Sequence, residues 1–275
     1  MPSTASKLFF PQQALASCMF AAVYRDTRGA ALSDKERINH FPASPLVSVT
    51  FVIHGELVLL QAQSDTGPAC HGNQSLTCFV TGPSDLPVSS WSPGDVTALT
   101  IAVYHDAWLR LGGDPEFQTI PKVLWDAYER FAGASEIDRG WTGFCAELSG
   151  VWDELCPREW RNVWGVSDWA QATLSRTLLT GAGRSLRSVE RRLKRMSGQT
   201  RRSLEFYSAF ESLHQLAIQN PDLPLAEVAL AAGYADQSHM GRAVRRATGF
   251  TPARLNTAIQ TDESFWCYRL LGERF

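Results

Sequence analysis

Residues 224–252, PLAEVALAAGYADQSHMGRAVRRATGFTP, constrain the fold of this 275-residue chain more than any other stretch. Pro224 can open a helix, because the N–H that proline lacks would be unpaired in the first turn anyway. Gly233 stands where that helix needs a left-handed residue to end it. Asp236 can then cap a second helix by accepting from the backbone N–H of His239 or Ser238. The spacing predicts a short helix, a tight turn and a second helix.

The second of these helices has two contrasting faces. Met240 and Val244 lie one turn apart and predict the buried face. The polar face carries Gln237, Ser238, Gly241, Arg242 and Arg245. After a glycine turn, such a helix can enter the major groove of DNA, where Arg bonds a guanine edge and Gln an adenine edge. Taken alone, the segment is equally compatible with an ordinary helical hairpin that has a polar face.

A similar unit lies upstream. Its first helix is predicted from four apolar residues, Trp169, Leu174, Leu178 and Leu179. That helix is expected to end at the glycine-rich turn 180–184. Its second helix follows in residues 185–200, SLRSVERRLKRMSGQT, with Ser185 as the predicted N-cap. Its buried stripe is predicted at Val189, Leu193 and Met196. Two helix-turn-helix units are therefore predicted in one chain.

The outer face of residues 185–200 is strongly basic. Its candidate DNA-contacting residues are Arg187, Glu190, Arg191 and Lys194. Glu190 can accept from a cytosine amino group, or it can pair with Arg187 or Lys194 on the same helix.

Residues 200–219 predict one helix of about five turns between the two units. Such a helix would fix the two groove-reading helices relative to each other. Because the duplex repeats about every 34 Å, one chain could reach two successive major grooves.

Charge is distributed unevenly along the chain, although its net value is only −2. Residues 184–254 hold 12 Arg and Lys against 6 Asp and Glu, and the remainder carries a net −8. This asymmetry is expected if the C-terminal part meets a polyanion. A solvated basic helix face would give the same count.

These C-terminal residues resemble the signature of AraC/XylS-type transcription regulators over about residues 166–256. The matching places in the second unit are Ala231, Gly233, Tyr234, Asp236, Ser238, His239, Met240, Arg242, Arg245, Arg246, Gly249, Thr251 and Pro252. The resemblance implies base contacts from Arg187, Glu190 and Arg191 in the first recognition helix, and from Gln237, Ser238, Gly241 and Arg242 in the second. Met240 replaces the usual aromatic residue, and Gly241 lacks a side chain that often contacts DNA.

The N-terminal part predicts a β-rich fold followed by helices. Residues 46–60 predict one or two strands, with a hairpin around His54-Gly55, and further strands are expected at 76–80 and 96–104. Gly and Pro turns between them favour a small sandwich or barrel over about residues 8–104. Helices are predicted at 105–111, 121–131 and 141–156. The last has an apolar stripe of Phe144, Leu148, Val151 and Leu155, which core packing explains better than pairing with a second copy.

The predicted fold class is α+β, with an all-α C-terminal domain. The family resemblance implies that the N-terminal domain is a cupin-like sensing or dimerisation domain. Its expected limits are residues 1–160, followed by the DNA-binding domain at 166–256 and a tail at 257–275.

Metal and cofactor chemistry is not expected. The candidate ligands lack an H-x-H pair with a downstream Glu; they are His40, His54, Glu56, His71 and His105. The six cysteines include no C-x-x-C pair, so reduced thiols are expected. Four aromatic residues could line a ligand pocket or fill the core: Phe51, Phe79, Trp91 and Tyr104. The chain shows no signal peptide or membrane span, which predicts a cytoplasmic protein.

The function predicted is sequence-specific DNA binding by a transcription regulator that is not an enzyme. Its partner is double-stranded DNA, and the N-terminal domain is expected to bind a small-molecule effector or a second copy of the chain, as a homodimer. Two alternatives remain at this point: a cupin-like enzyme with a helical accessory domain, and a partner-binding scaffold that no longer reads DNA.

Overall fold

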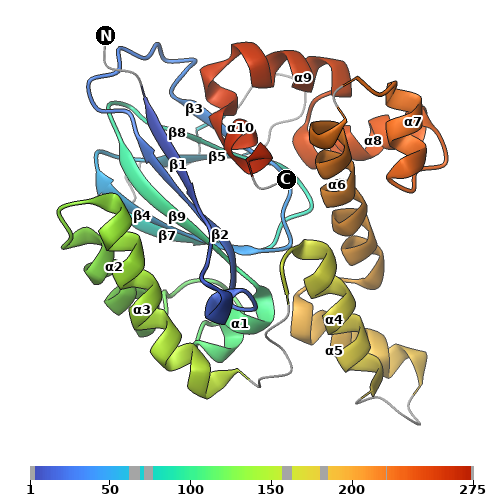
Figure 1. The fold of residues 1–275 in the computed structure, drawn as a ribbon, viewed down its shortest axis with the longest axis horizontal. Coiled ribbons are helices and arrows are strands. Elements are labelled where there is room, and N and C mark those ends of the chain that lie inside the picture. The colour runs from blue at the N-terminus through green and yellow to red at the C-terminus, as the bar shows by residue number, and fades with distance from the viewer. Residues whose placement is uncertain are drawn as a thin grey trace.

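The computed structural model describes residues 4–61, 69–70, 77–156, 163–179, 185–220 and 222–273. Two β-sheets and three helices form the N-terminal part, and the C-terminal part is helical (Figure 1). The predicted α+β class, with helix-turn-helix units at the C-terminal end, is confirmed. The cupin-like description and the domain limits stay predictions.

One sheet has five antiparallel strands in the order β1-β2-β9-β4-β7. They are β1 (Ala5–Phe9), β2 (Met19–Asp26), β9 (Thr97–Val103), β4 (Val47–His54) and β7 (Cys78–Thr81). Leu99, Ile101 and Val103 alternate along β9 and are completely buried. This period of two is what a half-buried central strand requires. It makes β9 the middle of the N-terminal core.

The other sheet has four strands in the order β3-β8-β5-β6. They are β3 (Ile38–Phe41), β8 (Val88–Trp91), β5 (Val58–Gln61) and β6 (Ala69–Cys70). The predicted hairpin at His54-Gly55 is wrong, because β4 and β5 belong to different sheets. Gly55 has φ +78°, and a Cβ there would lie 2.0 Å from the Asp95 carbonyl oxygen. Glycine thus lets the chain pass closely against Asp95 as it crosses between sheets.

Three helices follow the sheets: α1 (His105–Arg110), α2 (Lys122–Ala132) and α3 (Ile137–Leu155). Helices α2 and α3 lie against the five-stranded sheet (Figure 1), where Phe51 stacks on Tyr128 and Phe9 on Trp141. The predicted stripe on α3 is only partly right, because Phe144 and Leu148 are buried but Val151 is exposed. The large indoles of Trp141 and Trp152 determine which face of α3 is buried, because burying an indole removes more apolar surface from water than burying a valine does.

The C-terminal part contains seven helices within the described ranges. They are α4 (Val166–Leu179), α5 (Leu186–Ser197), α6 (Arg201–Gln219), α7 (Leu225–Ala231), α8 (Gln237–Thr248), α9 (Pro252–Thr261) and α10 (Trp266–Gly272). Short 3-10 turns occur at Gln13–Leu15 and Glu263–Phe265. No described helix combines the length and the hydropathy that crossing a bilayer requires.

The hydrophobic core is continuous between the two parts. Trp169 of α4 stacks on Tyr104 at the end of β9, with 5.4 Å between ring centroids. Its indole N–H donates to Asp106 at 2.8 Å, and Asp106 also pairs with Arg176. The first helix of the upstream unit is therefore anchored on the β-rich part.

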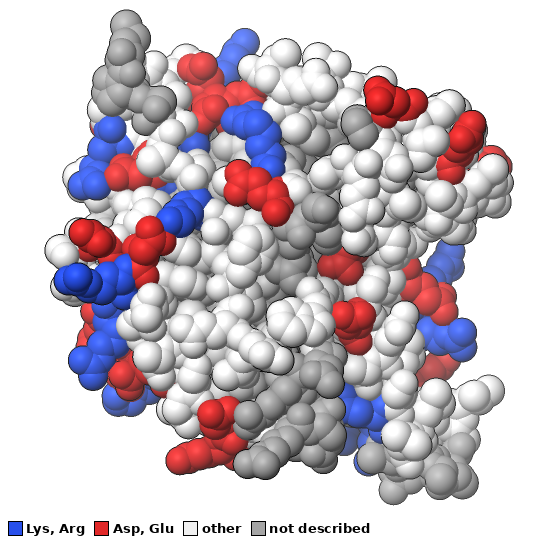
Figure 2. All heavy atoms as spheres, in the orientation of Figure 1, with Lys and Arg blue, Asp and Glu red and all other residues white. Residues whose placement is uncertain are grey.

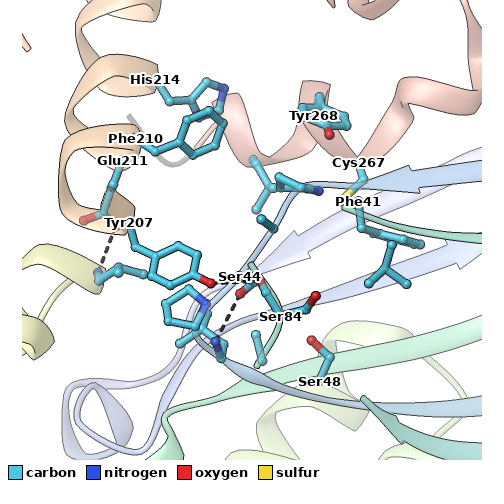
Figure 3. Close-up of a pocket in the computed structure, with 18 of the residues that line it drawn as sticks. Phe41, Ser44, Ser48, Ser84, Tyr207, Phe210, Glu211, His214, Cys267 and Tyr268 are labelled. Atoms are coloured by element: carbon cyan, nitrogen blue, oxygen red, sulfur yellow. Dashed lines mark hydrogen bonds between the residues drawn. The ribbon is translucent and has the colours of Figure 1, made fainter. Parts of the chain in front are cut away.

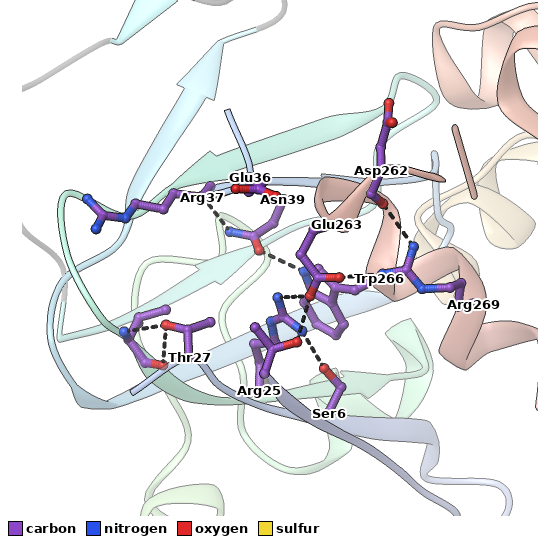
Figure 4. Close-up of polar contacts among 12 residues, drawn as sticks. Ser6, Arg25, Thr27, Glu36, Arg37, Asn39, Asp262, Glu263, Trp266 and Arg269 are labelled. Atoms are coloured by element: carbon purple, nitrogen blue, oxygen red, sulfur yellow. Dashed lines mark hydrogen bonds and ion pairs between the residues drawn. The ribbon is translucent and has the colours of Figure 1, made fainter. Parts of the chain in front are cut away.

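The end of the chain returns to the sheets through a polar cluster (Figure 4). Glu263 accepts from Arg25 of β2 at 2.6 Å and from Arg269 at 2.8 Å. The Trp266 indole donates to Asn39 at 2.7 Å, and the Arg25 guanidinium lies over the Trp266 ring. Residues 263–269 of the predicted tail pack on the β-rich part through these contacts.

Candidate DNA interface and adjoining cavity

The downstream unit has the caps that its sequence predicts. Gly233 follows α7 with φ +84°, and Gly249 ends α8 with φ +81°, so both occupy the left-handed region that glycine tolerates. The Asp236 carboxylate accepts from the His239 N–H at 2.6 Å. These caps fix where α8 begins and ends, and hence which residues lie on its first turns.

Helix α8 also has the predicted two faces. Met240 and Val244 are buried among α6, α7 and α9 residues in one apolar cluster. Four predicted DNA-contacting residues are exposed, and Gly241 is half-buried; the exposed ones are Gln237, Ser238, Arg242 and Arg245. Nothing lies within 4 Å of where a Cβ of Gly241 would stand. The chain thus presents an open polar surface along α8.

The upstream unit presents its basic residues in the same way. Arg187, Glu190, Arg191 and Lys194 are all exposed on α5. Leu193 is fully buried, whereas Val189 and Met196 are half-buried. Gly198 ends the helix with φ +69°. Ser185 occupies the N-cap place, but its side chain makes no capping bond; instead the Ser188 hydroxyl donates to the Ser185 carbonyl.

The face predicted for α4 is partly wrong. Trp169 is buried, but Leu178 and Leu179 are 61% and 81% exposed. Thr173 and Thr177 are buried in their stead, and the Thr177 hydroxyl donates to the Thr173 carbonyl at 2.7 Å. A hydroxyl satisfied within its own helix can be buried without an unpaired polar atom. The predicted turn at 180–184 lies outside the described residues.

One uninterrupted helix joins the two units, as predicted. Helix α6 begins at the Thr200 cap, whose hydroxyl accepts from the Ser203 N–H at 3.1 Å. Further along, the Glu211 carboxylate accepts from the backbone N–H groups of Val166 and Ser167 at the start of α4. This connection ties the middle of α6 to the upstream unit.

Both candidate recognition helices contact the β-rich part near their C-terminal ends. In α8, the Ala247 carbonyl accepts from the Ala43 N–H at 2.7 Å. In α5, the Met196 carbonyl lies 3.0 Å from Nδ1 of His105. Burial lowers the pKa of His105. These contacts were not predicted, because the sequence carries no signal for which loop meets which helix end.

The Lys and Arg side chains of the C-terminal part do not form a patch on the face shown in Figure 2. Over α7 to α9 this face shows mostly uncharged atoms with scattered acidic side chains, and Lys and Arg come into view mainly toward the lower right edge. This face therefore carries no continuous basic surface.

A cavity of about 310 Å³ lies between the sheets and the C-terminal helices (Figure 3). Its sheet side includes Phe41, Leu57 and Phe79, and its helix side includes Phe210 of α6 and Met240 and Val244 of α8. Of the four aromatic residues considered from sequence, only Phe79 lines it; Phe51 and Tyr104 are core residues, and Trp91 is half-buried outside the lining. The sequence did not predict Phe41, Tyr207, Phe210 and Tyr268 as lining residues, because they come from segments that meet only in the folded chain.

Most of the lining is apolar, with Ser, Thr and Asn side chains between the apolar ones, and further polar residues come from α6 and α10. The Tyr207 hydroxyl donates to the Ser84 carbonyl at 2.9 Å. His214 lies along the wall, and burial lowers its pKa to about 4. The Tyr268 hydroxyl is buried without a hydrogen-bond partner among the described residues, and burial raises its pKa.

The histidines considered as metal ligands are dispersed. His40 contacts the Ser89 hydroxyl, His54 ends β4, and His71 lies outside the described residues. No group of three or more His, Cys, Asp or Glu in the described part of the chain is placed to hold a metal ion.

Comparison with known proteins relates this geometry to a family. Residues 178–258 match a family model described as a helix-turn-helix domain. That range contains α5, α6 and α8 in full. No curated protein matches the chain.

Among solved structures, ToxT from Vibrio cholerae O395 is 8% identical, with a TM-score of 0.39, and the match covers 94% of this chain and 99% of ToxT. ToxT bound to (E)-4-(8-methylnaphthalen-1-yl)but-3-enoic acid is 10% identical, with 92% and 98% covered and a TM-score of 0.38. Unsaturated fatty acid bound wild-type ToxT from Vibrio cholerae strain SCE256 is 8% identical, with 79% and 93% covered and a TM-score of 0.35.

Proposed function

We propose that this chain, a DNA-binding transcription regulator with an AraC-type helix-turn-helix domain, reads its site through α5 and α8 and holds a small-molecule effector in the adjoining cavity. One observation carries the proposal: two helices with exposed Arg-bearing faces, each ended by a left-handed glycine, are joined by the uninterrupted helix α6. A rigid connection of this kind lets one chain address two successive major grooves.

In α8 we assign base reading to Gln237, Ser238 and Arg242, which lie on its first two turns. Arg242 can donate two bonds to a guanine, and Gln237 can pair with an adenine edge. Gly241 leaves room for the helix to approach the bases closely. Arg245 lies one turn further on, where we assign it a phosphate contact.

In α5 we assign base reading to Arg187, Glu190 and Arg191. Lys194, one turn further along, is assigned to a phosphate, because a flexible ammonium binds phosphate as a point charge. Glu190 is exposed on the same helix as Arg187 and Lys194, its two candidate pairing partners. Its carboxylate would accept from a cytosine amino group when those neighbours turn to DNA.

The effector proposal follows from which helices line the cavity. Met240 and Val244 place the buried side of α8 on its wall, while Phe41 and Leu57 come from the β-rich part. An occupant would therefore touch both parts of the chain at once. It shifts the arrangement of α8 only if it binds one arrangement more tightly than another.

The remaining assignments complete the proposal. The β-rich part, at about residues 1–160, is the sensing domain, residues 166–256 bind DNA, and the tail at 257–275 joins them. The protein acts in the cytoplasm and has no catalytic role. Reading two grooves requires only one chain, and pairing with a second copy would add a second pair of half-sites.

Selection of bound fragments from a random DNA pool, with the purified chain, tests the reading of a specific site. We expect one enriched sequence with two contacted segments about one helical turn apart. Arg242→Ala should cost about 1–3 kcal/mol at that site and relax preference at one base pair. Arg139→Ala, an exposed arginine on α3, is the matched control and should leave binding unchanged.

A salt series separates this function from that of a scaffold. A DNA reader loses affinity steeply as salt rises, yet keeps an excess for the selected duplex over a scrambled one. Equal binding to both duplexes at every salt concentration would refute sequence reading.

A further inference from the structure

We infer that the cavity takes an uncharged, largely apolar molecule bearing one hydrogen-bond-accepting oxygen, which the Tyr268 hydroxyl receives. This inference rests on the proposed effector role and specifies the chemical class of the ligand.

The cavity has the size and the lining of a small-molecule site. Its volume of about 310 Å³ lies at the lower end of the range found for such sites. Phe41, Phe79 and Phe210 contribute aromatic faces from both sheets and from α6, and Figure 3 shows Phe41 and Phe210 on opposite sides of the cavity. Apolar surface of this kind favours a hydrocarbon body over a heavily hydrated one.

The charges around the cavity disfavour an anionic ligand. None of the lining residues in the described part of the chain is Lys or Arg. Glu211 does line it, and its carboxylate is held by the N–H groups of Val166 and Ser167 at 2.9 and 2.7 Å. A ligand carboxylate would be desolvated without a counter-charge and in the company of a second carboxylate, and both effects oppose its charged form.

Arginine residues near the cavity do not compensate the charge of an anionic ligand. Arg25 and Arg246 are engaged by Glu263 at 2.6 Å and by Asp85 at 2.8 Å. His214 on the wall is neutral at pH 7, because burial lowers its pKa to about 4. A ligand anion would find no positive side chain on the described wall.

Tyr268 supplies the polar contact. The residue is only 4% exposed, and its hydroxyl has no partner among the described residues. Figure 3 shows this hydroxyl turned toward the other lining side chains. Burial raises the pKa of Tyr268, so the group keeps its proton and can donate it. A buried donor without a partner is costly, and a ligand carbonyl or ether oxygen would remove that cost.

Tyr234 provides a matched comparison within the same chain. It is 6% exposed, and its hydroxyl also lacks a partner among the described residues. Tyr234 is not among the residues that line the cavity. Removing its hydroxyl therefore changes the protein similarly without changing the proposed contact.

Isothermal titration calorimetry at pH 7.5 with 2-decanone and decanoate tests the inference on the full chain. These probes share a ten-carbon skeleton and differ in charge. We expect 2-decanone to bind at least about tenfold more tightly, since an unpaired buried charge is disfavoured. Tyr268→Phe should weaken 2-decanone binding about three- to tenfold, the usual effect of losing one hydrogen bond. Tyr234→Phe should leave it unchanged, and thermal unfolding should verify that both variants fold.

The outcomes test the ligand class and the effector role of the cavity separately. Decanoate binding as tightly as 2-decanone would overturn the ligand class while leaving the effector role intact. Equal losses in Tyr268→Phe and Tyr234→Phe would overturn the assigned contact. Failure of both probes to bind the wild-type chain would overturn the effector role of the cavity, and this inference with it.

Discussion

Asp85 accepts a hydrogen bond from Arg246 at 2.8 Å, which ties the C-terminal end of α8 to the segment between β7 and β8. The same guanidinium lies over the Phe206 ring of α6, 4.5 Å from its centroid. Arg246 therefore has two partners within the protein while it sits on the helix assigned to the major groove. Any movement of α8 toward DNA must therefore either break these two contacts or move Asp85 and Phe206 along with the helix.

Asp85→Ala should increase DNA affinity with little effect on stability. The paired side chains are 42% and 58% exposed, and such surface pairs contribute about 0–1 kcal/mol. Freed from Asp85, Arg246 can reach a phosphate, which would steepen the salt dependence by about one charge. Binding measured between low and physiological salt checks this, with Glu129→Ala on α2 as the control. An unchanged slope would show that Arg246 does not reach DNA.

Asp236→Ala should destabilise α8 and weaken binding to every DNA sequence. Loss of the bond from the His239 N–H removes an N-cap, which costs about 0.5–2 kcal/mol. Urea unfolding and binding to selected and scrambled duplexes would measure both effects. Asp236→Asn retains a capping oxygen, so it should behave almost as wild type. If it is as damaging as the alanine variant, the capping explanation is wrong.

Glu263→Gln should destabilise the protein more than Arg25→Met does. The Arg25 side chain is 6% exposed, so loss of its carboxylate partner leaves a buried charge uncompensated, at a cost of about 3 kcal/mol. Glu263 retains Arg269 when Arg25 is removed. Urea unfolding of both variants should reveal this order, and the reverse order would contradict it.

Acidification from pH 6.5 toward pH 4 should destabilise the folded chain through two histidines. Burial lowers the pKa of His40 and of His214 to about 4, below the usual 6.5. The unfolded chain therefore binds more protons in this window, and stability falls with pH by at most about 1.4 kcal/mol per unit for each histidine. The pKa of Asp26 is lowered to about 2, so its contribution is lost only at lower pH.

The histidine effect can be assigned with one variant. His214→Gln lacks one titrating group, so its free energy of unfolding should fall less steeply between pH 6.5 and pH 4.5. Urea unfolding at several pH values measures the slope. A variant with the wild-type slope would exclude His214 as a source.

Local signals predicted the DNA-binding part well. Gly233, Asp236 and Gly249 act within one turn of their own positions, so the sequence alone was sufficient to place α7 and α8. The exposed face of α5 followed from periodicity in the same way. For α4, periodicity chose Leu178 and Leu179, but tertiary packing buries Thr173 and Thr177 instead.

Non-local relationships could not be predicted from these signals. β1, β2, β3, β6 and β8 were missed, and β4 and β5 were joined in one hairpin, because sheet membership depends on distant pairing partners. The cavity was also missed, since Phe41, Tyr207 and Tyr268 are more than sixty residues apart from one another. Only the folded chain brings them to one wall.

The stacking of Trp169 on Tyr104 has a consequence for how this protein can be recombined. The indole that completes the β-rich core belongs to the DNA-binding part, while Trp266 in the tail is hydrogen-bonded to Asn39 of β3. A chimera that exchanged the DNA-binding part and the tail with those of a distant relative would lose both indoles and would leave Asp106 and Asn39 without these hydrogen-bond donors. Functional hybrids should therefore require Tyr104, Asp106 and Asn39 to be inherited along with the helices that they hold.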